Sequence, residues 1–394
     1  MRITGVTPVP VTFTTDREPM SFCFVRIDTE EGISGYGEAC DSFGCSFAGV
    51  VAAAISDAFA PLLVDAETGP VEAAAQRLRA WTRRRLGDQG VAAHARSAVE
   101  IALWDLAGKE AGRPVADLLG RARDRVAVYA SCGFLEEGSA SWHAEQLAPL
   151  VSRGVTAAKL RLGPNWRADL ATLRELRALL DASIELMVDG SEIFTVATAL
   201  RIADELGDLD VAWFEEPIPQ AEHAGVEELA RRAAVPIAYG EHLGGFDDAI
   251  GLLRRAPVTV LQPDASTCGG IAEARRVAQL GSSFGTRVVP HVCAGPVSLA
   301  ANLHLAAAVP AIRVVEYPPS LIGVWDALGF GPELGSGAIV DGTICVPEGP
   351  GLGVGLDEEA AGAHPYRPPR HLAGVRTGPV ALRSGFPDRF TGDR

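Results

Sequence analysis

Three carboxylates follow three predicted strands of this 394-residue chain at one fixed interval. Asp189 ends the run ELMVD, Glu215 ends VAWFE and Glu241 ends PIAYGE, so successive members lie 26 residues apart. In a barrel of parallel strands the carboxyl ends converge on one face, so we expect these side chains to crowd together. Each alone would suit a helix N-cap, but the shared interval favours one site in which the three oxygen ligands hold Mg²⁺, or Mn²⁺ as a substitute.

Further titratable residues end the later predicted strands. Asp264 ends VTVLQPD, His291 ends TRVVPH and Glu316 ends IRVVEY. The same barrel face would bring Asp264 and His291 together as a dyad in which the carboxylate orients the imidazole and raises its basicity. A histidine alone is more often a satisfied core residue. The carboxylates predicted around His291 favour a catalytic role.

Lysine is almost absent from the sequence. Only two of the 35 basic residues are lysines, Lys109 and Lys159. Lys109 lies in the helical stretch ALWDLAGKEAGRP, where a solvated or capping charge is the simpler interpretation. Lys159 and Arg161 lie in AAKLRL, where strand alternation points both side chains to one side. An ammonium is a compact charge with a tunable pKa, so the retention of Lys159 indicates a specific role.

Short β-branched runs alternate with amphipathic stretches from about residue 126 onward. The runs are VAVYA (126–130), AAKLRL (157–162), ELMVD (185–189), VAWFE (211–215), PIAYGE (236–241), VTVLQPD (258–264), TRVVPH (286–291) and IRVVEY (312–317). Eight strands alternating with helices predict an α/β fold of parallel βα units, a TIM-like barrel. A doubly wound sheet is disfavoured because no GxGxxG turn follows the first run.

The flanking segments are predicted to form one smaller α+β cap. Residues 1–125 begin with antiparallel strand patterns and continue with helices through Leu119, whereas residues 321–394 are rich in glycine and proline, with a short strand near TICVPEG. We therefore expect residues 126–320 to form the catalytic barrel. The two flanking segments together have the size of an ordinary small domain.

Composition excludes several classes of function. A formal charge of −15 and a pI near 5.0 disfavour partners such as nucleic acid or an acidic membrane, because these need a basic face. The beginning of the chain has no apolar signal segment, and no apolar run reaches the length of a membrane span. The seven cysteines are scattered without a CxxC pair, which predicts reduced thiols. We expect a cytoplasmic protein.

Taken together, the motifs resemble the mandelate racemase/muconate lactonizing enzyme family of the enolase superfamily, specifically its mandelate racemase subgroup. The resemblance runs nearly end to end, through MRITGVTPVPV, GYGEA, SAVEIALWDLAGKEAGRPVADLLG, KLR, MVD, FEEP, YGE, QPD, PH, VEY and GPGLGVGLDEE. It implies a (β/α)7β barrel under a cap, an essential Mg²⁺ on Asp189, Glu215 and Glu241, and a symmetric homo-oligomer. A lysine in place of the His291–Asp264 dyad would mark the muconate lactonizing subgroup instead.

The resemblance also implies roles for the surrounding residues. Glu316 would hydrogen-bond the substrate carboxylate, which Lys159 would also contact, and Glu216 would lie behind the metal ligands. Cap loops 14–20 and 41–47 would close over the far part of the substrate. Specificity would depend on those loops and on residues at the barrel end: Cys132, Ser191, His242 and Cys293.

One position departs from the family pattern. The usual strand motif is KxK, whose second lysine is a base facing the histidine across the substrate, but this chain has KxR with Arg161 in that place. Arginine is a poor general base because its pKa lies above about 12. The chain therefore has one good base, His291.

The chemistry implied is abstraction of the proton next to a carboxylate, which gives an enediolate. Loss of a β-hydroxyl would then make the protein a dehydratase of a sugar acid, an aldonate or an aldarate, and this outcome is favoured because only one good base is present. Reprotonation on the other face would make it a racemase or epimerase. An inactive metal-binding barrel is the third alternative, disfavoured by the full set of ligands and the intact dyad.

Overall fold

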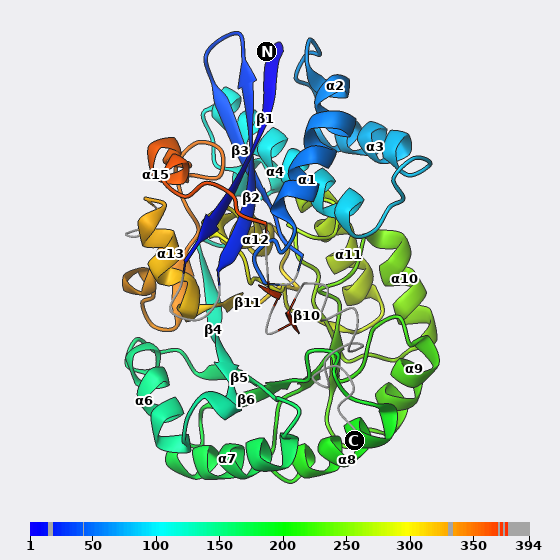
Figure 1. Cartoon of the computed structure of the whole chain (residues 1–394), viewed down its shortest axis with the longest axis vertical. Helices are drawn as coiled ribbons and strands as arrows, with labels where there is room; N and C mark the ends of the chain where they lie inside the picture. Colours follow the sequence, from blue (N-terminus) through cyan, green and yellow to red (C-terminus); the bar gives the residue numbers. More distant parts are fainter. Residues whose placement is uncertain (15–18, 42, 330–333, 369–370, 373–374, 377–394) are drawn as a thin grey trace.

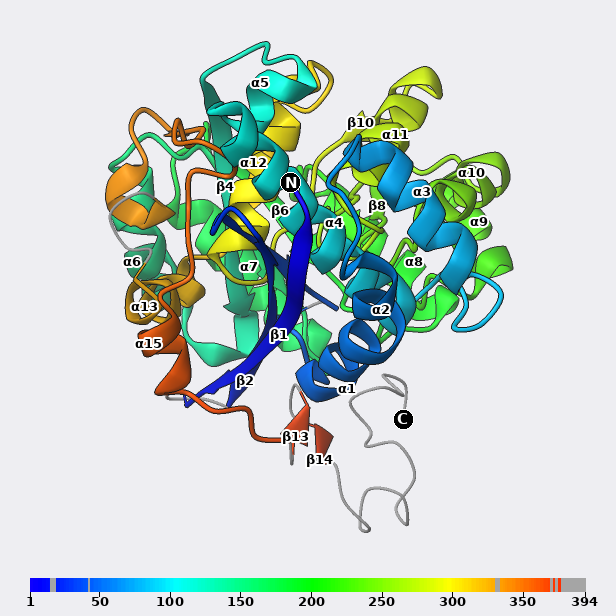
Figure 2. The same ribbon diagram turned by 90° about the horizontal axis from the view of Figure 1, so that it is seen from above.

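The chain folds into a barrel and a smaller cap (Figure 1). In this computed structural model, the described residues are 1–14, 19–41, 43–329 and 334–368, together with the backbone of 371–372 and 375–376. Figure 1 shows a ring of helices around a sheet below and three long strands with further helices above. Figure 2, seen from above, shows the cap strands lying over the barrel.

Eight parallel strands form the barrel, as the sequence predicts. They are β4 (Arg125–Phe134), β5 (Ala157–Arg161), β6 (Glu185–Asp189), β7 (Phe214–Glu215), β8 (Ile237–Tyr239), β9 (Val260–Leu261), β10 (Arg287–Val288) and β11 (Val314–Tyr317). Neighbours in the chain pair from β4 to β10, and β11 pairs with the other edge of β4. A parallel bridge between Val288 and Ile312 joins the two ends of the sheet. The predicted (β/α)7β barrel is confirmed.

Helices cover the outside of the sheet between successive strands. They are α6 (Ala140–Val151), α7 (Trp166–Leu179), α8 (Val196–Gly207), α9 (His223–Arg232), α10 (Phe246–Arg255), α11 (Ile271–Ser283) and α12 (Pro296–Ala308), with a 3-10 turn, η2 (Leu135–Glu137), before α6. In α10 the buried residues Ala249, Leu252 and Leu253 lie three and four positions apart, so they form one apolar stripe against the barrel.

Several barrel strands end earlier than their apolar runs. β9 stops at Leu261 and β10 at Val288, whereas the runs continue to Asp264 and His291. Each run contains a proline near its end, Pro263 or Pro290, which has no N–H to donate to the sheet. Asp264 and His291 therefore lie on the loops just beyond the strands.

An apolar layer fills the barrel interior directly below the predicted site. It consists of Tyr129, Met187, Trp213, Ala238, Val260 and Val289, which lie in barrel strands or directly next to one. Since side chains alternate along a strand, a residue two positions later points to the same side. Met187, Trp213 and Val289 thus precede Asp189, Glu215 and His291, which places the titratable side chains above a packed floor.

The cap is an antiparallel sheet backed by helices. The sheet is β1 (Ile3–Phe13), β2 (Met20–Thr29) and β3 (Ser34–Ala39), and the helices are α1 (Ala48–Ala54), η1 (Ile55–Phe59), α2 (Ala60–Leu63), α3 (Val71–Thr82), α4 (Val91–Ala111) and α5 (Val115–Leu119). The backbone of α4 lies against β3, since a Cβ at Gly37 would sit 1.9 Å from the Ala98 carbonyl oxygen. The predicted strands and the helices through Leu119 are present.

The segment after residue 320 contacts both parts. It contains η3 (Pro319–Leu321), α13 (Ile322–Ala327), η4 (Ser336–Ala338), β12 (Thr343–Cys345), α15 (Glu358–Gly362) and a small ladder of β13 (His371–Leu372) and β14 (Val375–Arg376). β12 pairs antiparallel with the barrel strand β4, and Pro365 bridges to Val11 of the cap sheet. This segment, predicted to complete the cap, thus also extends the barrel sheet.

Candidate active site

Lys159 on β5 lies at the centre of the buried charges at the carboxyl end of the barrel. Its Nζ lies 2.9 Å from Glu316 Oε1 and 3.8 Å from Asp189 Oδ2, and it donates a hydrogen bond to Glu215 Oε1. Burial disfavours the charged amine, but Glu215 and Glu316 outweigh that effect and hold the pKa of Lys159 well above its usual value. Lys159 is therefore a firmly held cation.

Glu215, at the end of β7, uses both carboxylate oxygens. Besides Lys159 at Oε1, its Oε2 accepts hydrogen bonds from Gln262 Nε2 at 2.6 Å and Trp213 Nε1 at 3.1 Å. Burial raises the pKa of Glu215 to about 7, against the opposing effect of Lys159. Sequence reasoning did not single out Trp213 or Gln262, although strand alternation places Trp213 on the same side as Glu215.

Asp189, at the end of β6, is held by Arg161. The Nε of Arg161 lies 3.0 Å from Asp189 Oδ2, while its Nη1 donates to the carbonyl oxygen of Cys132 at 2.8 Å. Ser191 donates to Asp189 Oδ1 from its backbone N at 2.7 Å and its Oγ at 3.1 Å. Burial disfavours the guanidinium charge, but Asp189 keeps the pKa of Arg161 above its usual value. Arg161 thus ties Asp189 to β4 as a fixed cation.

The structure brings Asp264 and His291 together, as the sequence predicts. His291 Nδ1 lies 3.0 Å from Asp264 Oδ2, and both residues are buried. Ser266, through its N and Oγ, and Asn302, through its Nδ2, all donate to Asp264 Oδ1 at 2.6–2.9 Å. Although burial opposes it, nearby carboxylates, led by Glu241, raise the pKa of His291 to about 10. Sequence reasoning missed Ser266 and Asn302. Their hydrogen bonds occupy Asp264 Oδ1, so the other carboxylate oxygen, Oδ2, faces the imidazole.

Glu241 borders a second acidic group. Its Oε2 lies 3.6 Å from His291 Nε2, and its Oε1 lies 3.6 Å from His242 Nε2. His242 also lies 3.3 Å from Glu216 Oε2 and 3.9 Å from Glu192 Oε2. Burial opposes protonation, but these carboxylates, led by Glu216, raise the pKa of His242 to about 11. Sequence reasoning missed Glu192, whose only signal is its place three residues after Asp189.

The residues present fit a divalent cation. Asp189, Glu215 and Glu241 supply oxygen atoms from adjacent strand ends, which is the ligand type that Mg²⁺ prefers. Within the described residues, Glu216 Oε1 is buried without a hydrogen-bond partner, and burial raises the pKa of Glu216 to about 8. Potential ligand atoms of Glu192, Glu216 and His242 lie within 4.8 Å of one another. The assignment of the ion to Asp189, Glu215 and Glu241 stays a prediction.

The cap reaches the barrel end beside these charges. Gly44 N donates to the carbonyl oxygen of Cys293 at 2.7 Å, and Cys40 N donates to the carbonyl oxygen of Ser266 at 3.1 Å. The loop 41–47, apart from residue 42, therefore lies next to the site, while most of loop 14–20 lies outside the described residues. Burial raises the pKa of the Cys132 and Cys293 thiols to about 12, so both are neutral near the site.

Comparison with known proteins confirms the family that the sequence motifs resemble. Residues 2–120 match the family described as mandelate racemase/muconate lactonizing enzyme, N-terminal domain, and residues 142–360 match enolase C-terminal domain-like. The chain is 31% identical to arabinonate dehydratase of Saccharolobus solfataricus, over 74% of this chain and 77% of that one. It is 32% identical to 3,6-anhydro-alpha-L-galactonate cycloisomerase of Streptomyces coelicolor, over 86% and 90%.

A solved structure agrees with the fold. A racemase from Streptomyces coelicolor A3(2) with bound magnesium superposes with a TM-score of 0.79 at 28% identity, covering 92% of this chain and 99% of that one. This chain belongs to the mandelate racemase/muconate lactonizing enzyme family of the enolase superfamily, in the mandelate racemase subgroup. No helix in the described part of the chain is both long enough and apolar enough to cross a membrane.

Proposed function

We propose that the protein is a Mg²⁺-dependent dehydratase that converts a sugar acid, an aldonate or aldarate, into a 2-keto-3-deoxy acid. The observation that carries the proposal is the asymmetry between two groups. His291 forms a dyad with Asp264 at 3.0 Å, whereas Arg161 is bound to Asp189 as a fixed cation. One proton-transfer group supports elimination better than exchange between two faces of the α-carbon.

Asp189, Glu215 and Glu241 would hold Mg²⁺, which supplies positive charge where negative charge develops on the substrate carboxylate. Lys159 would bind the same carboxylate, exchanging one of its present partners for the substrate. Bound Mg²⁺ would offset the carboxylates that raise the pKa of His291, and the neutral imidazole would then take the α-proton at Nε2, because Asp264 occupies Nδ1. It would then return a proton to the departing β-hydroxyl, which leaves as water.

Glu316 would complete the charge stabilisation. Burial alone would raise its pKa, but Lys159 and His291 lower the pKa of Glu316 to about 2, and its Oε2 accepts from Val292 N at 3.1 Å. Without substrate it is therefore an acceptor. A substrate carboxylate close to Glu316 would raise its pKa and favour the protonated form, which can donate a hydrogen bond to the enediolate.

A cycloisomerase is the second candidate, since two relatives carry that name. Loss of a ring oxygen in place of a hydroxyl would use the same proton abstraction and the same acid at His291. A racemase or epimerase would need a second titratable group, and Arg161 does not provide one. The buried charges make an inactive barrel the weakest alternative, because burying them without a function is costly.

Incubation with Mg²⁺ and a library of sugar acids and their lactones in D₂O, followed by ¹H NMR, tests the proposal. We expect a keto-deoxy product, with deuterium exchange confined to one configuration at the α-carbon. Ring opening without release of water would favour the cycloisomerase. Interconversion of epimers without a keto-deoxy product would contradict the proposal and show that Arg161 or another group acts as a second base.

A further inference from the structure

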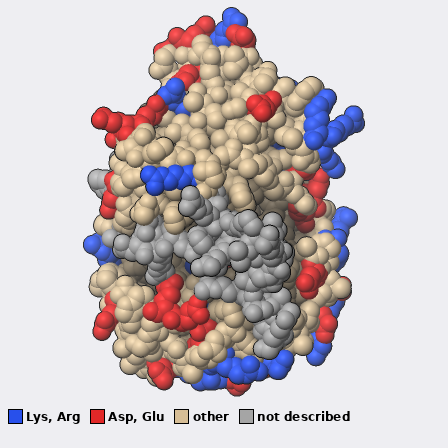
Figure 3. Space-filling view, viewed as in Figure 1, with Lys and Arg blue, Asp and Glu red and all other residues tan. Residues whose placement is uncertain are grey.

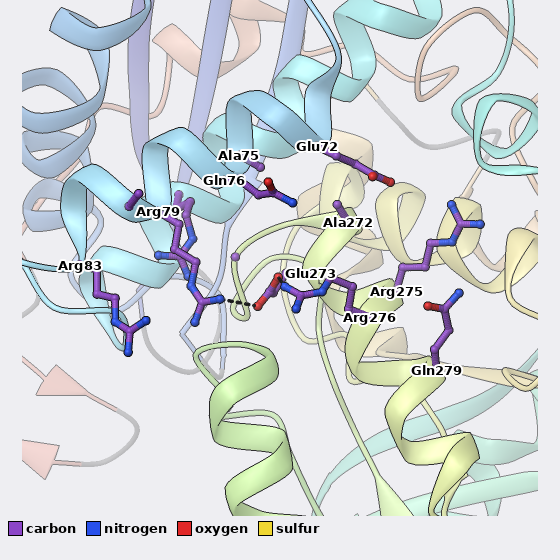
Figure 4. A pocket seen from close by; sticks show the side chains of 13 residues that line it. Glu72, Ala75, Gln76, Arg79, Arg83, Ala272, Glu273, Arg275, Arg276 and Gln279 are labelled. Carbon is purple, nitrogen blue, oxygen red and sulfur yellow. Dashed lines mark hydrogen bonds and ion pairs between the residues drawn. The ribbon is translucent and has the colours of Figure 1, made fainter.

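A cavity of about 530 Å³ lies at the seam between the cap and the barrel, lined by none of the residues of the candidate active site. Its walls are one face of α3 on the cap and one face of α11 on the barrel (Figure 4). Ala75 and Ala80 on α3 and Ala272 on α11 leave space between longer side chains. The volume lies in the range of small-molecule sites, roughly 300–1,000 Å³.

The lining of this seam cavity is positively charged, although the chain carries −15. Its charged residues are Arg79, Arg83, Arg96, Arg275, Arg276, Glu72 and Glu273. Five arginines against two glutamates give the lining a formal charge of +3. Asp88 and Asp247, which pair with Arg79 but do not line the cavity, reduce this to +1. The region therefore attracts anions more than the rest of the chain does.

Part of the lining is a rigid frame that joins the cap to the barrel. Arg79 Nη2 lies 2.6 Å from Asp88 and 2.9 Å from Asp247, and its Nη1 donates to Glu273 Oε1 at 3.3 Å. Arg276 Nη1 donates to Glu273 Oε2 at 2.8 Å. Glu273 is thus neutralised by arginines from both sides, and these guanidinium groups are held in place before any ligand arrives.

Other cations at the cavity lack strong partners. Arg275 makes no hydrogen bond or ion pair with the residues that the structure describes, and Arg83 has only a 3.7 Å contact with Asp247 while 63% of its side chain is exposed. Figure 4 shows these two arginines at opposite ends of the cavity. Figure 3 shows basic side chains gathered over the end of α3, where Arg83 is followed by Arg84 and Arg85.

We propose that the seam cavity binds a small organic dianion, a dicarboxylate or a phosphate ester. Arg275 would pair with its anionic group, and the amides of Gln76 on α3 and Gln279 on α11 would hydrogen-bond its other polar atoms. Guanidinium is suited to both carboxylate and phosphate. A ligand that contacts α3 and α11 together would stabilise the docking of the cap on the barrel.

Isothermal titration calorimetry of the Mg²⁺-loaded full chain at low ionic strength tests this proposal. Succinate and glycerol 3-phosphate are the two probes, and they distinguish the carboxylate source from the phosphate source. We expect one-to-one binding of at least one probe. Arg275→Gln should weaken binding about 10-fold, because it removes a charge-assisted contact. Glu72→Gln should tighten binding, because it removes a negative charge from the lining.

Arg174→Gln is the matched control, since Arg174 is an exposed arginine of α7 that pairs with Glu205 far from the seam. It should leave the affinity unchanged. Absence of binding by both probes, or equal effects of Arg275→Gln and Arg174→Gln, would overturn the proposal. So would binding that is lost in His291→Asn and kept in Arg275→Gln, because the anion would then occupy the active site. The titration measures binding directly, so its outcome is independent of the proposed reaction.

Discussion

The buried carboxylates at the junction of cap and barrel have different partners from those at the barrel end. At the junction of cap and barrel, Glu38 accepts from Gly295 N at 2.6 Å and Ser298 N at 2.9 Å, at the start of α12. Glu100 accepts from Ile271 N at 2.7 Å and Ala272 N at 2.9 Å, at the start of α11. The backbone N–H groups at a helix N-terminus are rigid donors and favour negative charge.

At the barrel end, the carboxylates instead face charged side chains. Glu215 pairs with Lys159, Asp189 with Arg161, and Glu216 keeps one oxygen without a hydrogen-bond partner among the described residues. Side-chain partners can be exchanged for a metal ion or a substrate, whereas helix N-termini cannot move independently of the fold. The comparison indicates that the junction carboxylates hold the cap in place, and it supports the proposal that the barrel-end carboxylates perform chemistry.

The largest expected effect follows from removing a predicted metal ligand. Glu215→Gln should reduce activity to background and abolish Mg²⁺ binding, because an amide carries no charge for the ion. Elemental analysis after gel filtration measures the bound metal, and circular dichroism checks the fold. Glu100→Gln, a buried carboxylate of the junction, is the matched control and should keep its metal.

The same measurement of bound metal can show that the ion is held by other residues. If Glu192→Gln or His242→Ala empties the protein of metal while Glu215→Gln retains it, the ion is held by the group of Glu192, Glu216 and His242, and the assignment to Asp189, Glu215 and Glu241 is wrong.

Removal of the proton-transfer group should have the next largest effect. His291→Asn is expected to lower kcat by ~10²–10⁴-fold while leaving bound metal and fold intact. Steady-state kinetics on the best substrate of the library provides the measurement, and His223→Asn, at an exposed position on α9, is the control. Near-normal turnover of His291→Asn would make His291 a structural residue.

Weakening the support of the imidazole should cost less. Asp264→Asn keeps the contacts with Ser266 and Asn302 largely possible but removes the charge facing His291 Nδ1, so we expect kcat to fall about 10- to 100-fold, the value of one charge-assisted hydrogen bond. The metal content should not change. An effect larger than that of His291→Asn would mean that Asp264 acts on more than the imidazole.

The smallest expected effect concerns stability at the junction. Burial raises the pKa of Glu38 to about 8, above the usual carboxyl value of 4.5. The folded state thus binds the proton more tightly than the unfolded state, so this contribution to stability is fully present below about pH 4.5 and is lost as pH rises through about 8.

Glu38→Gln should cost about 1–3 kcal/mol at pH 5, since a backbone N–H loses its acceptor, and the difference from the unaltered protein should shrink toward pH 8. Thermal unfolding at a series of pH values measures this, with the exposed Glu72→Gln as control. A difference that stays constant with pH would show that Glu38 is already ionised at pH 5.

The sequence by itself determined the order of elements and the main candidate catalytic positions. Short apolar β-branched runs separated by helical stretches specify the barrel, and the interval shared by Asp189, Glu215 and Glu241 follows from one repeated βα unit. The proximity of Asp264 and His291 was predictable for the same reason, because strand ends in a barrel converge. These features depend on local patterns and on a single topological rule.

Only the tertiary structure decided which donors hydrogen-bond to the carboxylates of the candidate site. Trp213, Gln262 and Asn302 hold site carboxylates, and the sequence does not show which carboxylate each of them reaches, because a hydrogen bond depends on distance and direction across strands. The junction contacts of Glu38 and Glu100 and the seam cavity between α3 and α11 join segments roughly 170 to 260 residues apart in the chain, which only the packing of cap on barrel brings together.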